Sequence, residues 1–135
     1  MIVPFQLTEH FSISEATTSA TATREGIKNI PSWDQLMALL HSAVQMERVR
    51  EFLGAPVLVT SWFRCPELNA AVGGVANSSH LSGHGVDFQA PGAGDLAMLF
   101  SRLANGPIDY DQLILEAGHL HISFAPAMRH EAFAQ

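Results

Sequence analysis

The stretch from Ser78 to Phe88 concentrates side chains that can bind a metal ion. It holds His80, His84 and Asp87, separated mostly by serine and glycine. Imidazole nitrogens and carboxylate oxygens are ligands that Zn²⁺ takes in proteins, and a catalytic zinc site has three protein ligands and one open position. A further imidazole near the C-terminus, on His121, completes such a set. We interpret His80, Asp87 and His121 as the ligands of one Zn²⁺ ion.

Glycine and serine around these ligands argue against a helix there, because both residues are poor helix formers. We predict instead a glycine-rich turn that carries His80, followed by a strand from His84 to Gln89 that carries Asp87. His84 is then a residue that supports the ligands or faces the substrate, rather than a third ligand.

A hairpin is predicted near the C-terminus, with strands at residues 111–116 and 119–124 and a two-residue turn between them. Side chains alternate along a strand, so His119 and His121 share one face and the intervening apolar residues point to the core. Across a two-residue turn, Glu116 lies opposite His119. Glu116, with His119 as its helper, is our candidate for the general base that moves protons in catalysis.

Three further elements are expected to position these residues. The apolar period after Ser32 predicts a long helix that ends at Gly54, and the run Val57–Ser61 predicts a buried strand. Arg64 follows this strand, where its guanidinium can bind a carboxylate or an oxyanion of the substrate, or can form a structural ion pair. Pro66–Val72 predicts a short helix.

The segments outside this framework carry weaker signals. Ser12 and Glu15 resemble a capping box, the polar run Thr17–Thr23 is predicted to be a surface loop, and residues 1–30 form an arm. Asp95 is predicted to cap a second amphipathic helix through Leu103. The residues from 126 onward carry no clear structural signal.

Composition limits the class of protein. The 135 residues are 47% hydrophobic and 15% charged, which fits one globular α+β domain over 1–135 with a small antiparallel sheet and flanking helices. A net charge of −6 argues against a nucleic-acid partner. No run is long and apolar enough for a membrane span, and no signal peptide is visible. Cys65 is the single cysteine; it is either a small packed residue or the nucleophile of a thiol hydrolase.

The motif Ser78-x-His80-x-x-Gly83-x-Gly85-x-Asp87 closely resembles the Ser-x-His-x-x-Gly-x-Ala-x-Asp signature of the zinc D-alanyl-D-alanine carboxypeptidase-like peptidases, the M15 family. This resemblance implies the zinc D-Ala-D-Ala peptidase fold, one Zn²⁺ ion and hydrolysis of peptide bonds. It also implies that Ser78 lies in the substrate-binding region.

The resemblance extends over roughly residues 5–125. The segment Val59–Asn69 is similar to the family's strand and its Ser-Gly-Tyr-Arg motif, which implies that Arg64 binds the substrate or the transition state. His121 matches the third zinc ligand of the family, on a terminal strand before a serine.

Three positions depart from the family pattern. Gly85 stands for alanine and Trp62 stands for glycine, and both changes are tolerable. Characterised members carry an acidic general base three residues before the last ligand, where this chain has Gly118. Glu116 lies five residues before that ligand and His119 two before it, and a hairpin turn can carry Glu116 into the same space.

The resemblance implies a monomeric zinc metallopeptidase that cuts peptidoglycan stem peptides, as a D,D-carboxypeptidase or an endolysin-type endopeptidase, with a zinc-activated water attacking the scissile carbonyl. We expect synthesis in the cytoplasm and action on the cell wall after release, as in phage lysis or from a virion. The alternative is a zinc-containing wall-binding or structural module of the same fold with weakened catalysis.

Overall fold

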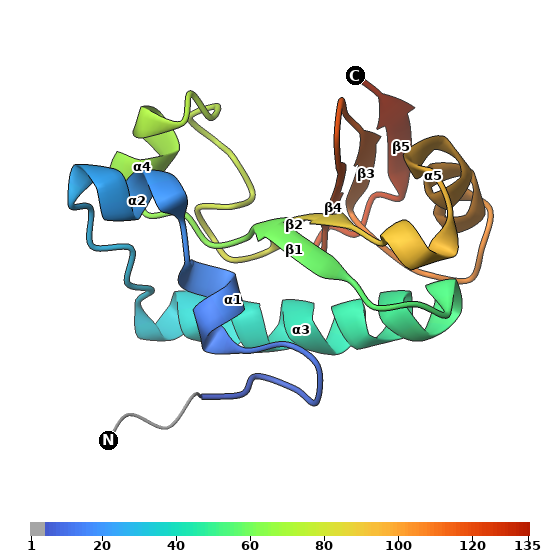
Figure 1. The fold of residues 1–135 in the computed structure, drawn as a ribbon, viewed down its shortest axis with the longest axis horizontal. Helices are drawn as coiled ribbons and strands as arrows, with labels where there is room; N and C mark the ends of the chain where they lie inside the picture. Colours follow the sequence, from blue (N-terminus) through green and yellow to red (C-terminus); the bar gives the residue numbers. More distant parts are fainter. Residues whose placement is uncertain (1–4) are drawn as a thin grey trace.

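The structure is a computed structural model that describes residues 5–135. A five-stranded sheet is surrounded by helices, and the long helix α3 runs beneath it (Figure 1). The helices are α1 (Ile13–Thr17), α2 (Ala20–Glu25), α3 (Trp33–Leu53), α4 (Pro66–Ala71) and α5 (Leu96–Ala104), with one 3₁₀ turn, η1 (Pro91–Ala93). The strands are β1 (Leu58–Ser61), β2 (Gly85–Gln89), β3 (Gln112–Leu115), β4 (Leu120–Ser123) and β5 (Glu131–Ala134).

The sheet has the order β1-β2-β4-β3-β5, and it is mixed. The first three pairings are antiparallel, whereas β5 runs parallel to β3. The α+β class is confirmed, but the expectation of an antiparallel sheet is wrong at β5. This strand has four exposed residues and no alternation between buried and exposed positions, so it leaves no strand signal in the sequence.

Helix α3 and the sheet enclose the core. The helix buries Leu39, Ala43, Met46 and Val49, and the core face of the sheet contributes Val86, Phe88, Leu113, Leu120 and Ile122. A capping box between Ser32 and Gln35 starts the helix, and Gly54 ends it in the left-handed conformation, as the sequence predicts. One buried polar residue, Ser42, lies on the same face of the helix and reaches toward the candidate site described below.

Two local predictions were wrong. The segment Thr17–Thr23 is not a loop, because Ser19 caps the short helix α2, and its hydroxyl accepts a hydrogen bond from the amide of Ala22. Strand β1 exists but is not buried: it forms one edge of the sheet, and Leu58 is 54% exposed. An apolar, β-branched run does not by itself distinguish an edge strand from a central one. The capping box of Ser12 and Glu15, by contrast, does open α1.

Among residues 5–135, no helix combines the length and the apolar character that crossing a membrane requires.

Candidate metal centre

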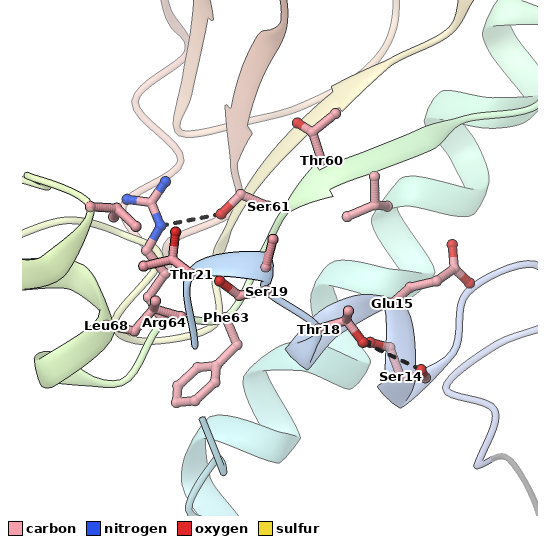
Figure 2. Close-up of a pocket in the computed structure, with 13 residues that line it drawn as sticks. Ser14, Glu15, Thr18, Ser19, Thr21, Thr60, Ser61, Phe63, Arg64 and Leu68 are labelled. Atoms are coloured by element: carbon pink, nitrogen blue, oxygen red, sulfur yellow. Dashed lines mark hydrogen bonds between the residues drawn. The ribbon is translucent and has the colours of Figure 1, made fainter. Parts of the chain in front are cut away.

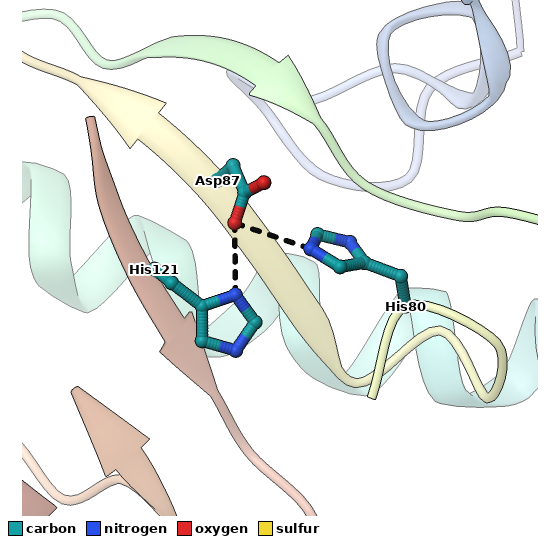
Figure 3. A group of neighbouring side chains, drawn as sticks. All are labelled: His80, Asp87 and His121. Carbon is teal, nitrogen blue, oxygen red and sulfur yellow. Dashed lines mark hydrogen bonds and ion pairs between the residues drawn. The ribbon is translucent and has the colours of Figure 1, made fainter. Parts of the chain in front are cut away.

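The sheet register brings two of the three expected ligands face to face. Asp87 on β2 lies directly opposite His121 on β4, and His80 approaches from the turn before β2 (Figure 3). Oδ1 of Asp87 is 2.8 Å from Nδ1 of His121 and 3.1 Å from Nε2 of His80. All three side chains are buried. The structure therefore assembles a compact His-Asp-His group that can hold a metal ion.

The far nitrogens of both imidazole rings have polar partners. Nδ1 of His80 lies 2.6 Å from the carbonyl oxygen of Trp62, which can only accept, so Nδ1 carries a proton and donates it. Nε2 of His121 lies 3.2 Å from the hydroxyl of Ser79, which can accept a proton from it. Contacts of this kind fix the tautomer and the orientation of imidazoles that bind metals. They direct Nε2 of His80 and Nδ1 of His121 at the same carboxylate oxygen.

The turn that carries His80 is fixed against α3. The carbonyl oxygen of Gly83 accepts hydrogen bonds from Ser42 (2.9 Å) and from the indole of Trp62 (3.3 Å). Gly83 has a φ of +89°, and a Cβ there would lie 3.0 Å from the backbone oxygen of Gln35. Only glycine combines this left-handed conformation with so close an approach to a helix. Gly83 thus sets the position of His80 through backbone geometry.

The electrostatics of Asp87 match a ligand role. Burial alone raises the pKa of a carboxyl, but hydrogen bonds from His121 and His80 and the charges of both rings outweigh it. The pKa of Asp87 is therefore held well below its usual range, and the group is a carboxylate at neutral pH.

The donor set fits a divalent cation of the zinc type. Two imidazole nitrogens and one carboxylate oxygen converge within 4.8 Å of one another. Lone pairs on both nitrogens repel the anionic oxygen unless a proton or a cation lies between them. Nitrogen and oxygen ligands in this number leave one coordination position free, which is the composition of catalytic rather than structural zinc sites.

Arg64 lies beside this group and is oriented by three contacts. Its Nε donates to the hydroxyl of Ser61 (3.2 Å; Figure 2), and one terminal nitrogen donates to Asn69 Oδ1 (3.3 Å). The other terminal nitrogen is 3.5 Å from Oδ2 of Asp87, the oxygen that faces away from the two histidines. The guanidinium is thus held at the edge of the site, as expected from its place after β1.

Glu116 and His119 form a hydrogen-bonded pair that approaches the same oxygen of Asp87 as Arg64 does. Oε2 of Glu116 is 2.8 Å from Nε2 of His119, and this nitrogen is 3.5 Å from Oδ2 of Asp87. The chain turns back at Ala117 and Gly118, where Gly118 has a φ of +99°. This turn returns Glu116 to the face of the sheet that carries the ligands. The hairpin geometry thus brings an acidic group close to Asp87, although position 118 itself is a glycine.

The two remaining residues predicted to bind substrate, Ser78 and His84, lie in different places. Ser78 lines the hollow in front of the ligands, and its hydroxyl accepts a hydrogen bond from the amide of His80 (3.2 Å). His84 does not join this group; its ring lies 6.5 Å from that of His41 on α3, and it does not line the hollow. The reason is alternation: His84 directly precedes β2, three residues from Asp87, and so points to the opposite side.

Sequence reasoning missed Ser79 and Asn69. The hydroxyl of Ser79 contacts His121, and the buried Asn69 binds Arg64 while its amide donates to the carbonyl oxygen of Val75 (2.9 Å). Asn69 lay inside the segment that resembles the family, but its burial depends on the loop after α4 and cannot be read from spacing.

The candidate ligands, Arg64, Glu116 and His119 all line one open hollow of about 920 Å³. A second hollow of about 620 Å³ lies on the other side of Arg64, between β1 and the helices α1, α2 and α4 (Figure 2). Arg64 contributes to both, but only the first is lined by the candidate ligands; the second has one carboxylate, that of Glu15, and no histidine. The first hollow is therefore the candidate active site.

A buried His-Asp-His group in an open, polar hollow is the kind of ligand set found in metal-dependent hydrolases, in which three protein ligands leave one position free. The family model described as Peptidase M15 matches residues 9–123. The chain therefore belongs to the peptidase M15 family, as the sequence motif indicates. A search of curated proteins finds no match to this chain. Members of the M15 family are zinc-dependent metallopeptidases.

Proposed function

We propose that this protein is a zinc metallopeptidase that hydrolyses peptide bonds in the stem peptides of bacterial peptidoglycan. The family match supports peptidase chemistry, and the observation that carries the proposal is the arrangement around Asp87. One carboxylate oxygen faces the two imidazoles, whereas the other faces Arg64 and the Glu116–His119 pair. The candidate metal ligands, the guanidinium of Arg64 and the candidate proton acceptor Glu116 are therefore grouped around the side chain of Asp87.

Each group has a defined part in amide hydrolysis. His80, Asp87 and His121 would hold Zn²⁺, which supplies a Lewis acid that polarises the scissile carbonyl and acidifies water when it is bound. Arg64, fixed by Ser61 and Asn69, binds a substrate carboxylate or the negative charge that develops on the carbonyl oxygen.

Glu116 moves the proton. A carboxylate oxygen of Glu116 accepts a proton from the attacking water and then delivers it to the departing amine, which leaves protonated. His119 donates a hydrogen bond to Oε2 of Glu116 and so holds the carboxylate toward the site. Expected substrates are peptides ending in D-Ala-D-Ala, cut by a carboxypeptidase, or an internal stem or cross-link bond, cut by an endopeptidase.

The test is incubation of the protein with purified peptidoglycan fragments, with and without a chelator, followed by mass spectrometry. Loss of a terminal D-Ala that the chelator suppresses would support a carboxypeptidase, and an internal cut would support an endopeptidase. Bound zinc with no product from several wall types would instead support a non-catalytic wall-binding module. Inhibition by thiol alkylation with indifference to chelators would indicate chemistry at Cys65.

A further inference from the structure

One row of residues crosses the sheet from the candidate metal centre to its far edge. Asp87 pairs with His121, His121 with Ile114, and Ile114 with Phe133 on β5. Residues that pair across neighbouring strands point to the same face of a sheet. Ile114 and Phe133 therefore continue the face that carries the ligands, and both line the same hollow.

This end of the row is apolar and accessible. Phe133 is 41% exposed, and Ile114 is partly exposed. The neighbouring side chain of Arg129 forms ion pairs with Asp111 and Glu131. Among the described residues of β5 and the segment just before it, the one arginine therefore already has anionic partners. An aliphatic group that enters the hollow can remove apolar surface from water here without leaving a charge unpaired.

Strand β5 is a fixed wall rather than a loosely attached end. The buried carboxylate of Asp111 accepts hydrogen bonds from the backbone amide, Nε and a terminal nitrogen of Arg129, at 3.0, 2.9 and 2.8 Å. The ring of His130 stacks on Tyr110 with the ring centroids 4.2 Å apart. The amide of Gln135 donates to the carbonyl oxygen of Leu115, beyond Phe133, so both ends of β5 are held.

We propose that Ile114 and Phe133 form an apolar subsite that receives an aliphatic side chain of the substrate next to the scissile bond. The inference rests on the proposed peptidase function and adds a determinant of specificity to it. Phe133 lies outside residues 9–123, the part of the chain that the family model matches. Ile114 lies within the matched segment, so Phe133 is the part of the subsite that lies beyond it.

The first test compares peptides that carry glycine, alanine or valine at the residue flanking the cut. In the unaltered protein, kcat/KM should rise about fourfold for each methyl group that the subsite buries, with the change mainly in KM. Phe133→Ser should abolish this preference, and Phe133→Leu should retain most of it. Met98→Ser, which alters another exposed apolar side chain (51% exposed) on α5, is the matched control and should change nothing.

The second test separates this inference from the proposed function. Glu116→Gln protein in the presence of zinc, with and without Phe133→Ser, is titrated with the glycine and alanine peptides and followed by NMR, so that the peptides are not consumed. A preference for alanine that is present in the Glu116→Gln protein and is lost when Phe133→Ser is added supports the subsite. The same preference for alanine in both proteins, or no binding of the alanine peptide by either, would overturn the proposed subsite. Failure of the proposed function alone would appear as preferential binding without any cleavage in the zinc-loaded protein.

Discussion

The hydroxyl of Ser79 lies 3.2 Å from Nε2 of His121 and fills the space that a Cβ on Gly85 would occupy. When Nδ1 of His121 binds a cation, Nε2 carries the proton and donates it to this hydroxyl. Loss of such a supporting contact typically lowers metal affinity by about 10- to 100-fold. We expect Ser79→Ala to weaken zinc binding within this range, measured by competition with a chelating dye.

Ser82→Ala is the matched control, because Ser82 lies on the same turn but its hydroxyl donates to the backbone oxygen of Ser79. It should bind zinc like the unaltered protein. Gly85→Ala gives a second check, since the added methyl group would displace the Ser79 hydroxyl and crowd the ring of His121, and it should also weaken binding. Unchanged affinity in both Ser79→Ala and Gly85→Ala would show that the hydroxyl does not support His121.

Removing the metal or one of its ligands should destabilise the fold. A cation that binds only the folded state at a free concentration of about 1,000 times its Kd adds about 4 kcal/mol to the free energy of unfolding. A chelator should remove this contribution from the unaltered protein. Asp87→Asn and His121→Ala should lose zinc and no longer respond to the chelator, measured by metal analysis and urea unfolding. Full zinc occupancy in His121→Ala would remove that residue from the ligand set.

Arg64→Ala should separate substrate binding from metal binding. Zinc content should be retained, while kcat/KM falls by about 10²- to 10³-fold, the usual cost of losing one donor to a developing oxyanion. Arg64→Lys should recover little activity, because one ammonium group cannot reach Ser61, Asn69 and Asp87 together. The control is Arg24→Ala, an exposed arginine whose side chain is 69% accessible. Unchanged kinetics with lower stability would make Arg64 a structural ion-pair residue.

Glu116→Gln should leave zinc binding and stability intact but lower kcat by about 10²- to 10⁴-fold, because the amide cannot accept the proton of the attacking water. His119→Ala should have a smaller effect, since it only orients Glu116. Steady-state kinetics of both variants on one peptide tests this order. If His119→Ala is the more damaging change, the assignment of the general base is reversed.

The neutral imidazole of His84 should make stability depend on pH. Burial lowers the pKa of His84, the charge of exposed His41 lowers it further, and Asp111 opposes both. The unfolded chain therefore takes up the proton first, so stability is complete above pH ~6.5 and declines as the pH falls from there toward the folded pKa.

His84→Gln should flatten this decline. Urea unfolding of both proteins at pH 7.5 and 5.5, in the presence of a chelator, isolates the contribution of His84, because the remaining titrating groups are the same. Parallel pH profiles for the two proteins would contradict a role for His84 in the dependence.

The clustering of His80, Asp87 and His121 was predictable because two short motifs encode it. His80 and Asp87 lie on one turn and strand, and His121 lies on a strand whose alternation fixes its face. The contact between Glu116 and His119 was also predictable, since a two-residue turn sets which residues lie opposite each other. These inferences need only local geometry.

The missed features depend on contacts between distant segments. Strand β5 forms because Arg129 binds Asp111, which lies 18 residues earlier, and no local pattern marks it. The exposure of β1 depends on its edge position, and the support of Arg64 by Asn69 depends on the path of the loop after α4. Neither propensity nor periodicity contains such information.

The parallel pairing of β5 with β3 also affects how readily two copies of the chain can associate through their sheets. Without β5, strand β3 would present the unpaired amides and carbonyls of Leu113 and Leu115 at a sheet edge, where a second chain could add its own strand. With β5 in place, the outermost strand is short, consists of exposed residues and carries the charge of Glu131. Strand β5 therefore replaces an apolar sheet edge with a short, charged one, a change that disfavours edge-to-edge aggregation.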